Sequence, residues 1–397
     1  MKIGLYGGSF NPIHNGHIAV AEAVKDAFGL DCILLMVAKD PPHKQVEGHV
    51  SAELRLAMSA LALEGKKGIC ASALEITREG KSYTIDTLRA LKKIFTGAQI
   101  YCIVGADMLI DLPTWREAPE LMRTNAFIAA GRTGVMEDIS AQAQALEAQY
   151  GARIFLSSFV GPEISSTQIR ERVFAAKSLG GFTPQRVENS IYENGLYQPP
   201  EICAMQTKLR ASIKEERYLH SMRTVCAAIA LAARYGEDTK KARLAALLHD
   251  CGKFSAEMQN KRAEEYGLAL DDMRAVSPSI VHGPLGAEVA RREYGVEDAQ
   301  ILSAIYWHTL CKTNMSALEK IIYLADKIEA GRDYEGVDEI RNAAEKSLDE
   351  GVLACMEHSL RYLQAAGKTI HPNLFSARDF LIKKRESAQK NKKEEQH

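Results

Sequence analysis

Two histidines near the start of the chain have the spacing and surroundings of an anion site. His14 and His17 end the string Gly7-Gly8-Ser9-Phe10-Asn11-Pro12-Ile13-His14-Asn15-Gly16-His17, which follows a strand-like run and precedes a helical pattern. Paired glycines let a backbone approach phosphates closely, and exposed N–H groups at a helix start favour an anion. Residues three apart share one face of a helical turn, so both rings can point toward the same phosphate. The string therefore predicts a cradle for a phosphorylated ligand.

A second set of chemical groups lies in the other half of the chain, in an order typical of metal ligands. Four histidines and two aspartates occur in or beside helical patterns, namely His220, His249, Asp250, His282, His308 and Asp326. Their wide intervals suit ligands from several helices that converge in a bundle core. Leu247-Leu248-His249-Asp250 ends an apolar helical run in two polar groups, whose burial is costly unless they are paired or bind metal. We expect a metal site here.

The elements that must position these groups differ between the two halves. Up to about residue 197, β-rich runs (residues 3–6, 32–37, 100–104, 126–130 and 153–156) alternate with helical stretches such as 18–28 and 51–63. This alternation predicts a parallel sheet with helices on both faces. Beyond Pro199-Pro200, helical segments follow one another at residues 205–235, 239–248, 299–307, 317–330 and 343–366. We expect an α/β domain over residues 1–198, an all-α bundle over 203–382, and a frayed polar tail over 383–397.

Composition limits the class of protein. The 50 basic and 51 acidic side chains nearly cancel, so no overall field favours nucleic acid or an anionic membrane, and anionic ligands need local sites. The eight cysteines form no C-x-x-C pair, which is typical of reduced thiols. The N-terminus runs directly into a strand-like segment, without a signal-peptide layout, and no stretch has the roughly 18 apolar residues of a membrane span. We expect a cytoplasmic enzyme.

The N-terminal half carries two signatures of one superfamily. Residues 8–17 match G-x-F-x-P-x-H-x-G-H, and the second signature occurs as Ile164-Ser165-Ser166-Thr167-Gln168-Ile169-Arg170. By these the half resembles the nucleotidylyltransferase superfamily. It is most similar to bacterial nicotinate-mononucleotide adenylyltransferases, through Pro41-Pro42-His43-Lys44, Ser82-Tyr83-Thr84, Gly105-Ala106-Asp107 and Leu112-Pro113-Thr114-Trp115. The resemblance implies a Rossmann-like fold and AMP transfer from ATP to nicotinate mononucleotide, giving deamido-NAD and pyrophosphate.

The same resemblance implies roles for the matching positions. His14, His17 and Arg170 would be catalytic, by stabilising charge on the phosphates. ATP would contact Gly8, Ser9, Phe10, Gly105, Asp107, Ile164, Ser165, Ser166 and Thr167, with Mg²⁺ on the triphosphate. Lys44 would bind the mononucleotide phosphate, Tyr83 and Thr84 the pyridine carboxylate, and Trp115 would stack on the ring. An existing phosphate oxygen is already a nucleophile, so the reaction needs alignment and charge stabilisation but no covalent residue.

The ligand order H…HD…H…H…D in the second half resembles the HD-domain phosphohydrolases, over about residues 203–380. The two intermediate histidines are similar to those of members that hold two metals, and the neighbouring strings resemble bacterial hydrolases that cleave diadenosine tetraphosphate symmetrically into two ADP. The resemblance implies one metal on His220, His249, Asp250 and Asp326, and a second on His282 and His308 with Asp250 bridging. It favours iron, while Mn, Zn and Co also suit these ligands. Arg217, Lys253 and Arg332 are candidate phosphate contacts.

Other functions remain open at this level. The first half could instead catalyse another adenylyl or cytidylyl transfer, such as pantetheine-phosphate adenylylation, although Tyr83, Thr84 and Trp115 argue against it. The helical half could be a nucleotidase, a phosphodiesterase or a non-catalytic regulatory module, since the HD pattern specifies substrate weakly. Nucleic-acid binding is disfavoured by the charge balance. The sequence leaves open the oligomeric state, a homo-oligomer included.

Overall fold

The computed structural model describes residues 1–41, 48, 50–130 and 136–394 of the 397-residue chain. The chain divides into two compact units. The first comprises Met1–Glu171 and Leu179–Ser190, and the second comprises Arg172–Ser178 and Ile191–His397. The predicted proline linker is a helix start, because Pro199 precedes helix α9 (Pro200–Ser212) directly.

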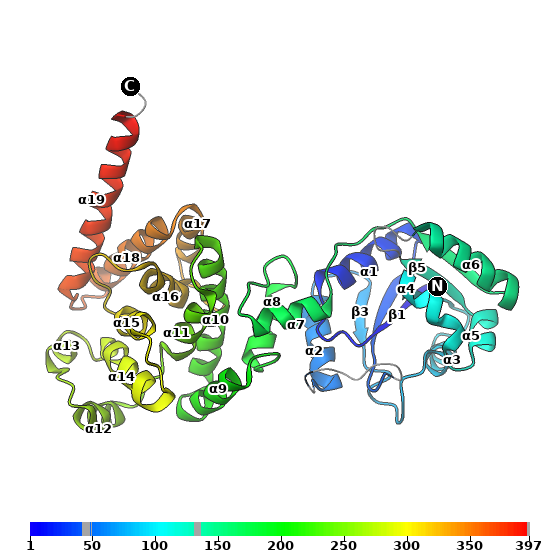
Figure 1. The fold of residues 1–397 in the computed structure, drawn as a ribbon, viewed down its shortest axis with the longest axis horizontal. Coiled ribbons are helices and arrows are strands. Elements are labelled where there is room, and N and C mark those ends of the chain that lie inside the picture. The colour runs from blue at the N-terminus through cyan, green and yellow to red at the C-terminus, as the bar shows by residue number, and fades with distance from the viewer. Residues whose placement is uncertain (42–47, 49, 131–135, 395–397) are drawn as a thin grey trace. The chain divides into compact units, whose positions relative to one another are not determined.

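A six-stranded parallel sheet forms the centre of the first unit (Figure 1). Its strand order is β3-β2-β1-β4-β5-β6. The strands are β1 (Lys2–Gly8), β2 (Cys32–Val37), β3 (Ile69–Ser72), β4 (Gln99–Gly105), β5 (Ala126–Ala130) and β6 (Arg153–Ser157). The predicted α/β fold is confirmed, and the five predicted strand runs all fall on strands. The short strand β3 was missed.

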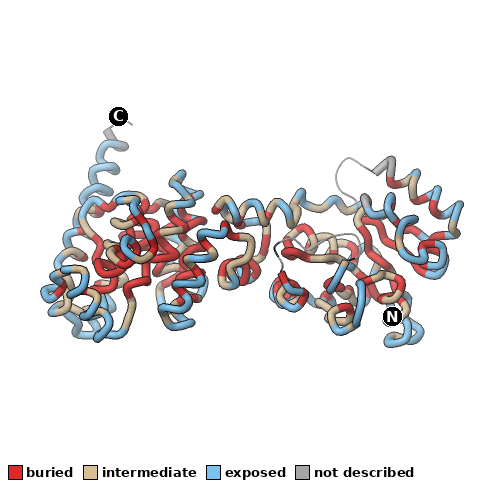
Figure 2. The backbone as a smooth tube through the Cα atoms, turned by 60° about the horizontal axis from the view of Figure 1, so that its bottom comes forward, coloured by how far each residue is buried: buried red, intermediate tan, exposed pale blue. Residues whose placement is uncertain are grey.

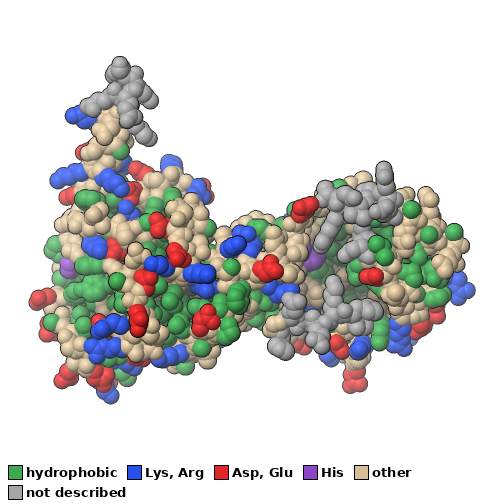
Figure 3. All heavy atoms as spheres, in the orientation of Figure 1, with side chains coloured by type: hydrophobic (Ala, Val, Ile, Leu, Met, Phe, Trp, Pro, Cys, Tyr) green, Lys and Arg blue, Asp and Glu red, His purple; other side chains and the backbone are tan. Residues whose placement is uncertain are grey.

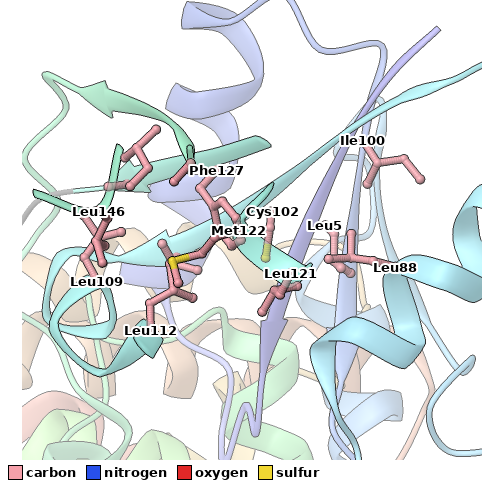
Figure 4. Close-up of a cluster of buried hydrophobic side chains, with 14 of the residues drawn as sticks. Leu5, Leu88, Ile100, Cys102, Leu109, Leu112, Leu121, Met122, Phe127 and Leu146 are labelled. Atoms are coloured by element: carbon pink, nitrogen blue, oxygen red, sulfur yellow. The ribbon is translucent and has the colours of Figure 1, made fainter. Parts of the chain in front are cut away.

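The sheet's strands are apolar because both of its faces are covered. Every residue of β5 is buried, and side chains from several strands and helices share one core cluster, part of which is drawn in Figure 4. Leu5, Cys102 and Phe127 come from the sheet, whereas Leu88, Leu121 and Leu146 come from helices α3 (Thr84–Ile94), α5 (Ala118–Thr124) and α6 (Met136–Tyr150). Helices α1 (Asn15–Ala27) and α2 (Ala52–Ala62) lie outside this cluster and contact strands β2, β3 and β5.

The strand order places a ligand-binding position between β1 and β4. Chain connections run outward in opposite directions from these two strands, and open α/β sheets bind ligands outside the carboxyl ends of strands at such a reversal. Tyr6 pairs with Ile103, so Gly8 and Gly105 end the two strands at the same level. Both glycines are predicted ATP contacts, and the topology puts them at the same edge.

Shorter helices complete the first unit, and two helices cross its limits. Helix α4 (Ala106–Asp111) and the 3₁₀ helix η2 (Leu112–Thr114) follow β4. Helix α7 (Ser166–Phe174) begins in the first unit and ends in the second, as does α8 (Gln185–Glu193).

The second unit is all-helical among its described residues, as predicted (Figure 1). After α9 its helices are α10 (Glu215–Tyr235), α11 (Thr239–Leu248), α12 (Ala256–Tyr266), α13 (Asp271–Val276), η3 (Pro278–Ile280), α14 (His282–Tyr294), α15 (Ala299–Trp307), α16 (Ala317–Ile328), α17 (Val337–Lys346), α18 (Leu348–Ala365) and α19 (Pro372–Glu394). Helices α10, α11, α15 and α16 pack against one another, and most of the predicted ligands lie on them or directly after their last residues. Figure 2 shows this packed centre as buried backbone.

Two of the long helices predicted for the second half, over residues 205–235 and 343–366, are each divided into two helices in the structure. The first breaks at Ile213, which is extended, and the second breaks at Ser347, whose hydroxyl accepts the Glu350 N–H and caps α18. Ser347 and Glu350 have the serine-then-glutamate spacing of a helix start, so this second break had a local signal.

The C-terminal tail continues helix α19 as far as Glu394, and residues 383–391 are exposed (Figure 2). The predicted frayed end at residue 383 is therefore helical over the part that the structure describes. On the face seen in Figure 3, basic and acidic side chains are interspersed, in keeping with the balanced composition. None of the described helices combines the length and apolar character that crossing a membrane requires.

The buried carboxyl of Glu188 on α8 makes stability depend on pH. Burial raises its pKa to about 7, although hydrogen bonds from the Leu179 backbone and Gln185 lower it. Because the pKa is raised in the folded state, folding favours the protonated form of Glu188. The contribution of this group to the free energy of unfolding is therefore complete below the ordinary pKa of 4.5 and is lost as pH rises through 7. Glu188→Gln, which mimics the protonated group, should therefore stabilise the protein at pH 8 by up to about 3 kcal/mol and change little at pH 4.

Urea unfolding of wild type and variant at both pH values measures this difference. Glu171→Gln changes an exposed glutamate near the same helices and serves as the matched control. Equal stabilities of wild type and Glu188→Gln at pH 8 would contradict the assignment.

Candidate functional sites

The loop between β1 and α1 positions the histidine pair. His14 is the N-cap of α1, and its Nδ1 accepts the His17 N–H at 3.3 Å, while the His17 Nδ1 accepts the His14 N–H at 3.3 Å. The rings stack with centroids 3.6 Å apart. A neutral ring whose Nδ1 accepts a hydrogen bond carries its proton on Nε2. Both histidines therefore offer Nε2–H donors, the kind of group that phosphate oxygens accept.

Phe10 braces this loop from within. It is buried and has a positive φ of 45°, a conformation that costs energy for a residue with a side chain. Its ring packs over Gly8, where a Cβ would lie 3.0 Å from Phe10 Cζ, and meets the His17 ring edge-to-face at 5.0 Å. A side chain at position 8 would therefore push against the phenylalanine ring that contacts His17.

Hydrogen bonds join the second signature to the first. Ser166 Oγ donates to the Pro12 carbonyl at 2.8 Å, and Arg170 Nη1 donates to the Asn11 carbonyl at 2.9 Å. Ser165 accepts the Gln168 N–H and so caps α7, and Arg170 also donates to Thr167 Oγ1 at 3.1 Å. Two segments more than 150 residues apart thus bring the N-termini of α1 and α7 to one loop. Helix N-termini carry partial positive charge, so the arrangement suits a polyphosphate.

Arg55 on α2 ties this loop to the one after β2, a role that sequence patterns did not reveal. It is 1% exposed, and its guanidinium donates to the carbonyls of Ser9 at 2.5 Å, Lys39 at 3.3 Å and Val50 at 3.3 Å. A buried arginine needs such partners, and these come from both predicted substrate loops.

The predicted mononucleotide contacts lie at the start of α3 and after η2. Tyr83 is the N-cap of α3, and Thr84 is therefore the first residue of the helix. The Tyr83 N–H donates to the Lys81 carbonyl at 3.1 Å. Arg116 lies over the Tyr83 ring at 4.6 Å, and Trp115 packs partly buried against the core cluster. The structure brings these two segments together. Lys44 lies outside the described residues, and the Asp107 side chain is likewise not among those described.

The six predicted metal ligands converge inside the helical unit. His220 comes from the second turn of α10, His249 and Asp250 follow α11, His282 starts α14, His308 follows α15, and Asp326 is on α16. All six are buried. Two groups have donor atoms within 4.8 Å of one another: His220, His249 and Asp326, and His249, Asp250 and His308. His282 Nε2 lies 3.0 Å from Asp250 Oδ1 and so extends the second group.

Hydrogen bonds at the outer nitrogen fix the histidine rings. The Nδ1 atoms of His249, His282 and His308 lie 2.7, 2.7 and 2.6 Å from backbone carbonyls three residues earlier, to which they must donate. Their Nε2 atoms therefore carry lone pairs. The Nε2 atoms of His220 and His249 are 3.3 Å apart, and those of His282 and His308 are 3.1 Å apart. Facing lone pairs repel unless a cation lies between or beside them, so these residues fit bound metal ions.

The protonation states also suit metal binding. Burial lowers the pKa of His249 to about 3, and burial lowers the pKa of His282, so both rings are neutral near pH 7. Burial alone would raise the pKa of Asp250 and Asp326, but the surrounding histidines and, for Asp326, the Lys327 ammonium hold both pKa values well below the usual range. Neutral imidazoles and ionised carboxylates are the forms that bind metal.

Four cations surround the ligand cluster. Lys253 Nζ is 3.3 Å from Asp250, Arg217 Nη1 is 3.9 Å from Asp250, and Arg332 Nη2 is 2.7 Å from Asp326. The three candidate phosphate contacts are thus brought to the site. Lys327 Nζ, which sequence reasoning missed, is 2.6 Å from Asp326. Such a rim of charge suits an anionic ligand.

The sheet and its phosphate loop define the first unit as a nucleotide-binding α/β domain, and residues 5–172 match the cytidylyltransferase-like family. Nicotinate-nucleotide adenylyltransferase of Bacillus subtilis is 36% identical over 197 residues, which cover 50% of this chain and 98% of that protein. The protein named "Probable nicotinate-nucleotide adenylyltransferase" from Gloeobacter violaceus is 38% identical over 200 residues, covering 50% of this chain and 97% of its own length. The chain belongs, through its first half, to the nicotinate-nucleotide adenylyltransferase family.

The second half has relatives of its own. Residues 217–331 match the HD domain, a range that contains all six clustered ligands. A solved structure described as a predicted HD superfamily hydrolase involved in NAD metabolism, from Clostridium acetobutylicum, is 37% identical, covers 46% of this chain and 96% of that chain, and has a TM-score of 0.44.

The role of Arg55 can be tested by substitution. Lysine keeps the charge, but its donors all lie on one nitrogen, whereas Arg55 uses three separate nitrogens to reach the Val50, Ser9 and Lys39 carbonyls. We expect Arg55→Lys to lower the free energy of unfolding by about 1–3 kcal/mol, because buried polar groups lose partners. Amide hydrogen exchange should also become faster around Phe10 and Lys39. Exchange measured by mass spectrometry, with the exposed Arg123→Lys as control, checks this expectation. Unchanged protection in both loops would show that Arg55 does not hold them.

Proposed function

We propose that the first half transfers AMP from ATP to nicotinate mononucleotide, forming deamido-NAD and pyrophosphate. The supporting observation is the pair of hydrogen bonds that join the two phosphate signatures, from Ser166 to Pro12 and from Arg170 to Asn11. They gather His14, His17, Arg170 and two helix N-termini around one position, where charge on a transferring phosphoryl group would be spread. Mg²⁺ bound to the triphosphate would neutralise further charge. The sequence relatives named above support the substrate.

For the mononucleotide we propose a binding place at the N-terminus of α3. Thr84 begins that helix, whose first N–H groups would receive the pyridine carboxylate, and Tyr83 and Trp115 would flank the ring. Lys44 would bind the phosphate. Gly8, Ser9, Phe10, Gly105, Asp107, Ile164, Ser165 and Thr167 would contact ATP.

We propose that the HD unit hydrolyses diadenosine tetraphosphate to two ADP. The supporting observation is the convergence of four histidine Nε2 atoms on Asp250 and Asp326. Metal ions bound there, with iron favoured over Mn, Zn or Co, would supply water of lowered pKa and neutralise charge on a leaving phosphate. Arg217, Lys253, Lys327 and Arg332 would hold the substrate's phosphates. Asp250 contacts His249, His282 and His308, which suits a residue shared by two ions.

We assign residues 1–198 to the transferase and 203–382 to the hydrolase. Another nucleotide phosphohydrolase activity is the second candidate for the HD unit, because the cationic rim fits any compact polyphosphate.

Preference for the acid over the amide tests the transferase assignment. The N–H groups at the start of α3 can bond a carboxylate, whereas the NH₂ of a nicotinamide would face donors with another donor. We expect kcat/KM for nicotinate mononucleotide to exceed that for nicotinamide mononucleotide by at least about 100-fold. Chromatography of the dinucleotide products gives both rates. Equal or better use of the amide would exclude the proposed substrate and leave the transferase class standing.

One variant in each half tests whether the two activities belong to separate halves of the chain. His17→Ala removes one donor to developing charge, so its kcat for adenylyl transfer should fall by about 10²–10³ with a smaller change in the KM for ATP, and its hydrolase should be unaffected. Asp250→Ala should abolish diadenosine tetraphosphate cleavage and leave adenylyl transfer intact. Both activities are measured on the same metal-loaded preparations, with Mg²⁺ supplied for adenylyl transfer. After chelator treatment and restoration of Mg²⁺ alone, adenylyl transfer should persist and hydrolysis should be lost. ATP and AMP as hydrolysis products, or full hydrolysis by Asp250→Ala, would overturn the hydrolase assignment.

A further inference from the structure

The outer nitrogen of His220 has a different partner from those of the other three clustered histidines. His249 and His308 follow the last residues of their helices, and His282 follows η3, so a carbonyl three residues earlier can accept each Nδ1–H. His220 is the sixth residue of α10, where the preceding carbonyls already accept the helix's own N–H groups. A histidine inside a helix needs a partner from elsewhere. Its Nδ1 lies 3.2 Å from Glu329 Oε1.

Glu329 is held firmly in this position. It is 4% exposed and is the residue directly after helix α16, three positions after Asp326. Its second oxygen accepts the Gly331 N–H at 2.5 Å, and Arg332 Nε lies 3.6 Å from its first oxygen. Both of its oxygens face donors, the His220 Nδ1–H and the Gly331 N–H, with the Arg332 guanidinium beside them, which is an environment that suits an ionised carboxylate. A fixed negative charge therefore stands directly behind the His220 ring.

This charge makes the two ends of the cluster unequal. At the end formed by His220, His249 and Asp326, two carboxylates (Asp326 and Glu329) face two cations (Lys327 and Arg332). At the end formed by Asp250, His282 and His308, one carboxylate faces two cations, Lys253 and Arg217, and the ring partners are neutral carbonyls. A carboxylate behind a ligating histidine also raises the basicity of the ring. Both effects favour a cation at the first end.

We propose that Glu329 is a positioning residue that makes the His220–His249–Asp326 end the tighter of two unequal metal-binding ends. It orients the Nε2 lone pair of His220 and strengthens it as a donor. At the end containing His282 and His308, both rings donate to backbone carbonyls instead, and this end exchanges its ion more readily. This inference rests on the metal-dependent hydrolase proposed above.

Titration of the chelator-treated full-length chain with Co²⁺ tests the proposal. Visible absorption reports the environment of each bound ion, and competition with a chelator of known affinity gives the two dissociation constants. Wild type should bind two Co²⁺ in two separate steps. Glu329→Gln keeps an oxygen near Nδ1 but removes the charge, and Glu329→Ala removes both. The tighter step should weaken by about 10–100-fold, more in Glu329→Ala than in Glu329→Gln, while the weaker step stays in place.

Controls separate this effect from loss of folding and from failure of the hydrolase assignment. Glu345→Gln changes an exposed glutamate of α17 and should leave both steps unchanged. Helical circular dichroism checks that the variants fold, since general unfolding would weaken both steps together. Two equal steps in wild type, or a weaker step that moves in Glu329→Gln while the tighter one does not, would overturn this inference alone. A wild-type chain that binds no Co²⁺ and cleaves no dinucleotide would overturn the hydrolase assignment as well.

Discussion

One constraint governs both sites: an imidazole has two nitrogens, and a hydrogen bond at one decides what the other can do. In the phosphate loop, Nδ1 of His14 and of His17 accepts a backbone N–H, so each Nε2 carries a proton and suits an anion. In the HD unit, Nδ1 of His249 and of His308 donates to a carbonyl, so each Nε2 carries a lone pair and suits a metal. The same side chain serves opposite chemistry because its place in the helix differs. A histidine at a helix start meets N–H groups without partners, and one at a helix end meets carbonyls without partners.

The sequence predicted the parts of the fold whose causes are local. Apolar runs identified five strands, because both faces of a parallel sheet are buried. Strand β3 (Ile69–Ser72) has only four residues, and of these only Ile69 is buried. The ligand order identified all six clustered residues. His and Asp beside apolar helical runs become buried, and their burial costs free energy unless they are paired or bind metal. The break at Ser347 was missed although a local cap marks it.

Other functional groups could not be found in this way, because their partners are distant in sequence. In the sequence, Arg55 is an ordinary charged residue of an amphipathic helix. Only the folded sheet places the Ser9 and Lys39 carbonyls beside it. In the sequence, Glu329 is only a residue that follows a helix. In the structure, α10 places His220 beside it, although the two are 109 positions apart in the chain. Buried polar groups of this kind are determined by tertiary contacts, and a periodic pattern carries no trace of them.

The helix dipoles also favour an anion in the phosphate loop and a cation in the metal cluster. The phosphate loop receives the N-termini of α1 and α7, whose partial positive charge favours an anion. The metal cluster receives the C-terminal ends of α11, α15 and α16, next to His249, His308 and Asp326, and their partial negative charge favours a cation. His282 is the exception, because it is the first residue of α14 and stands at a positive helix end. The field of the helices therefore opposes a cation beside His282 and favours one beside Asp326, so the backbone itself makes the two ends of the cluster different before any outer-shell carboxylate is considered.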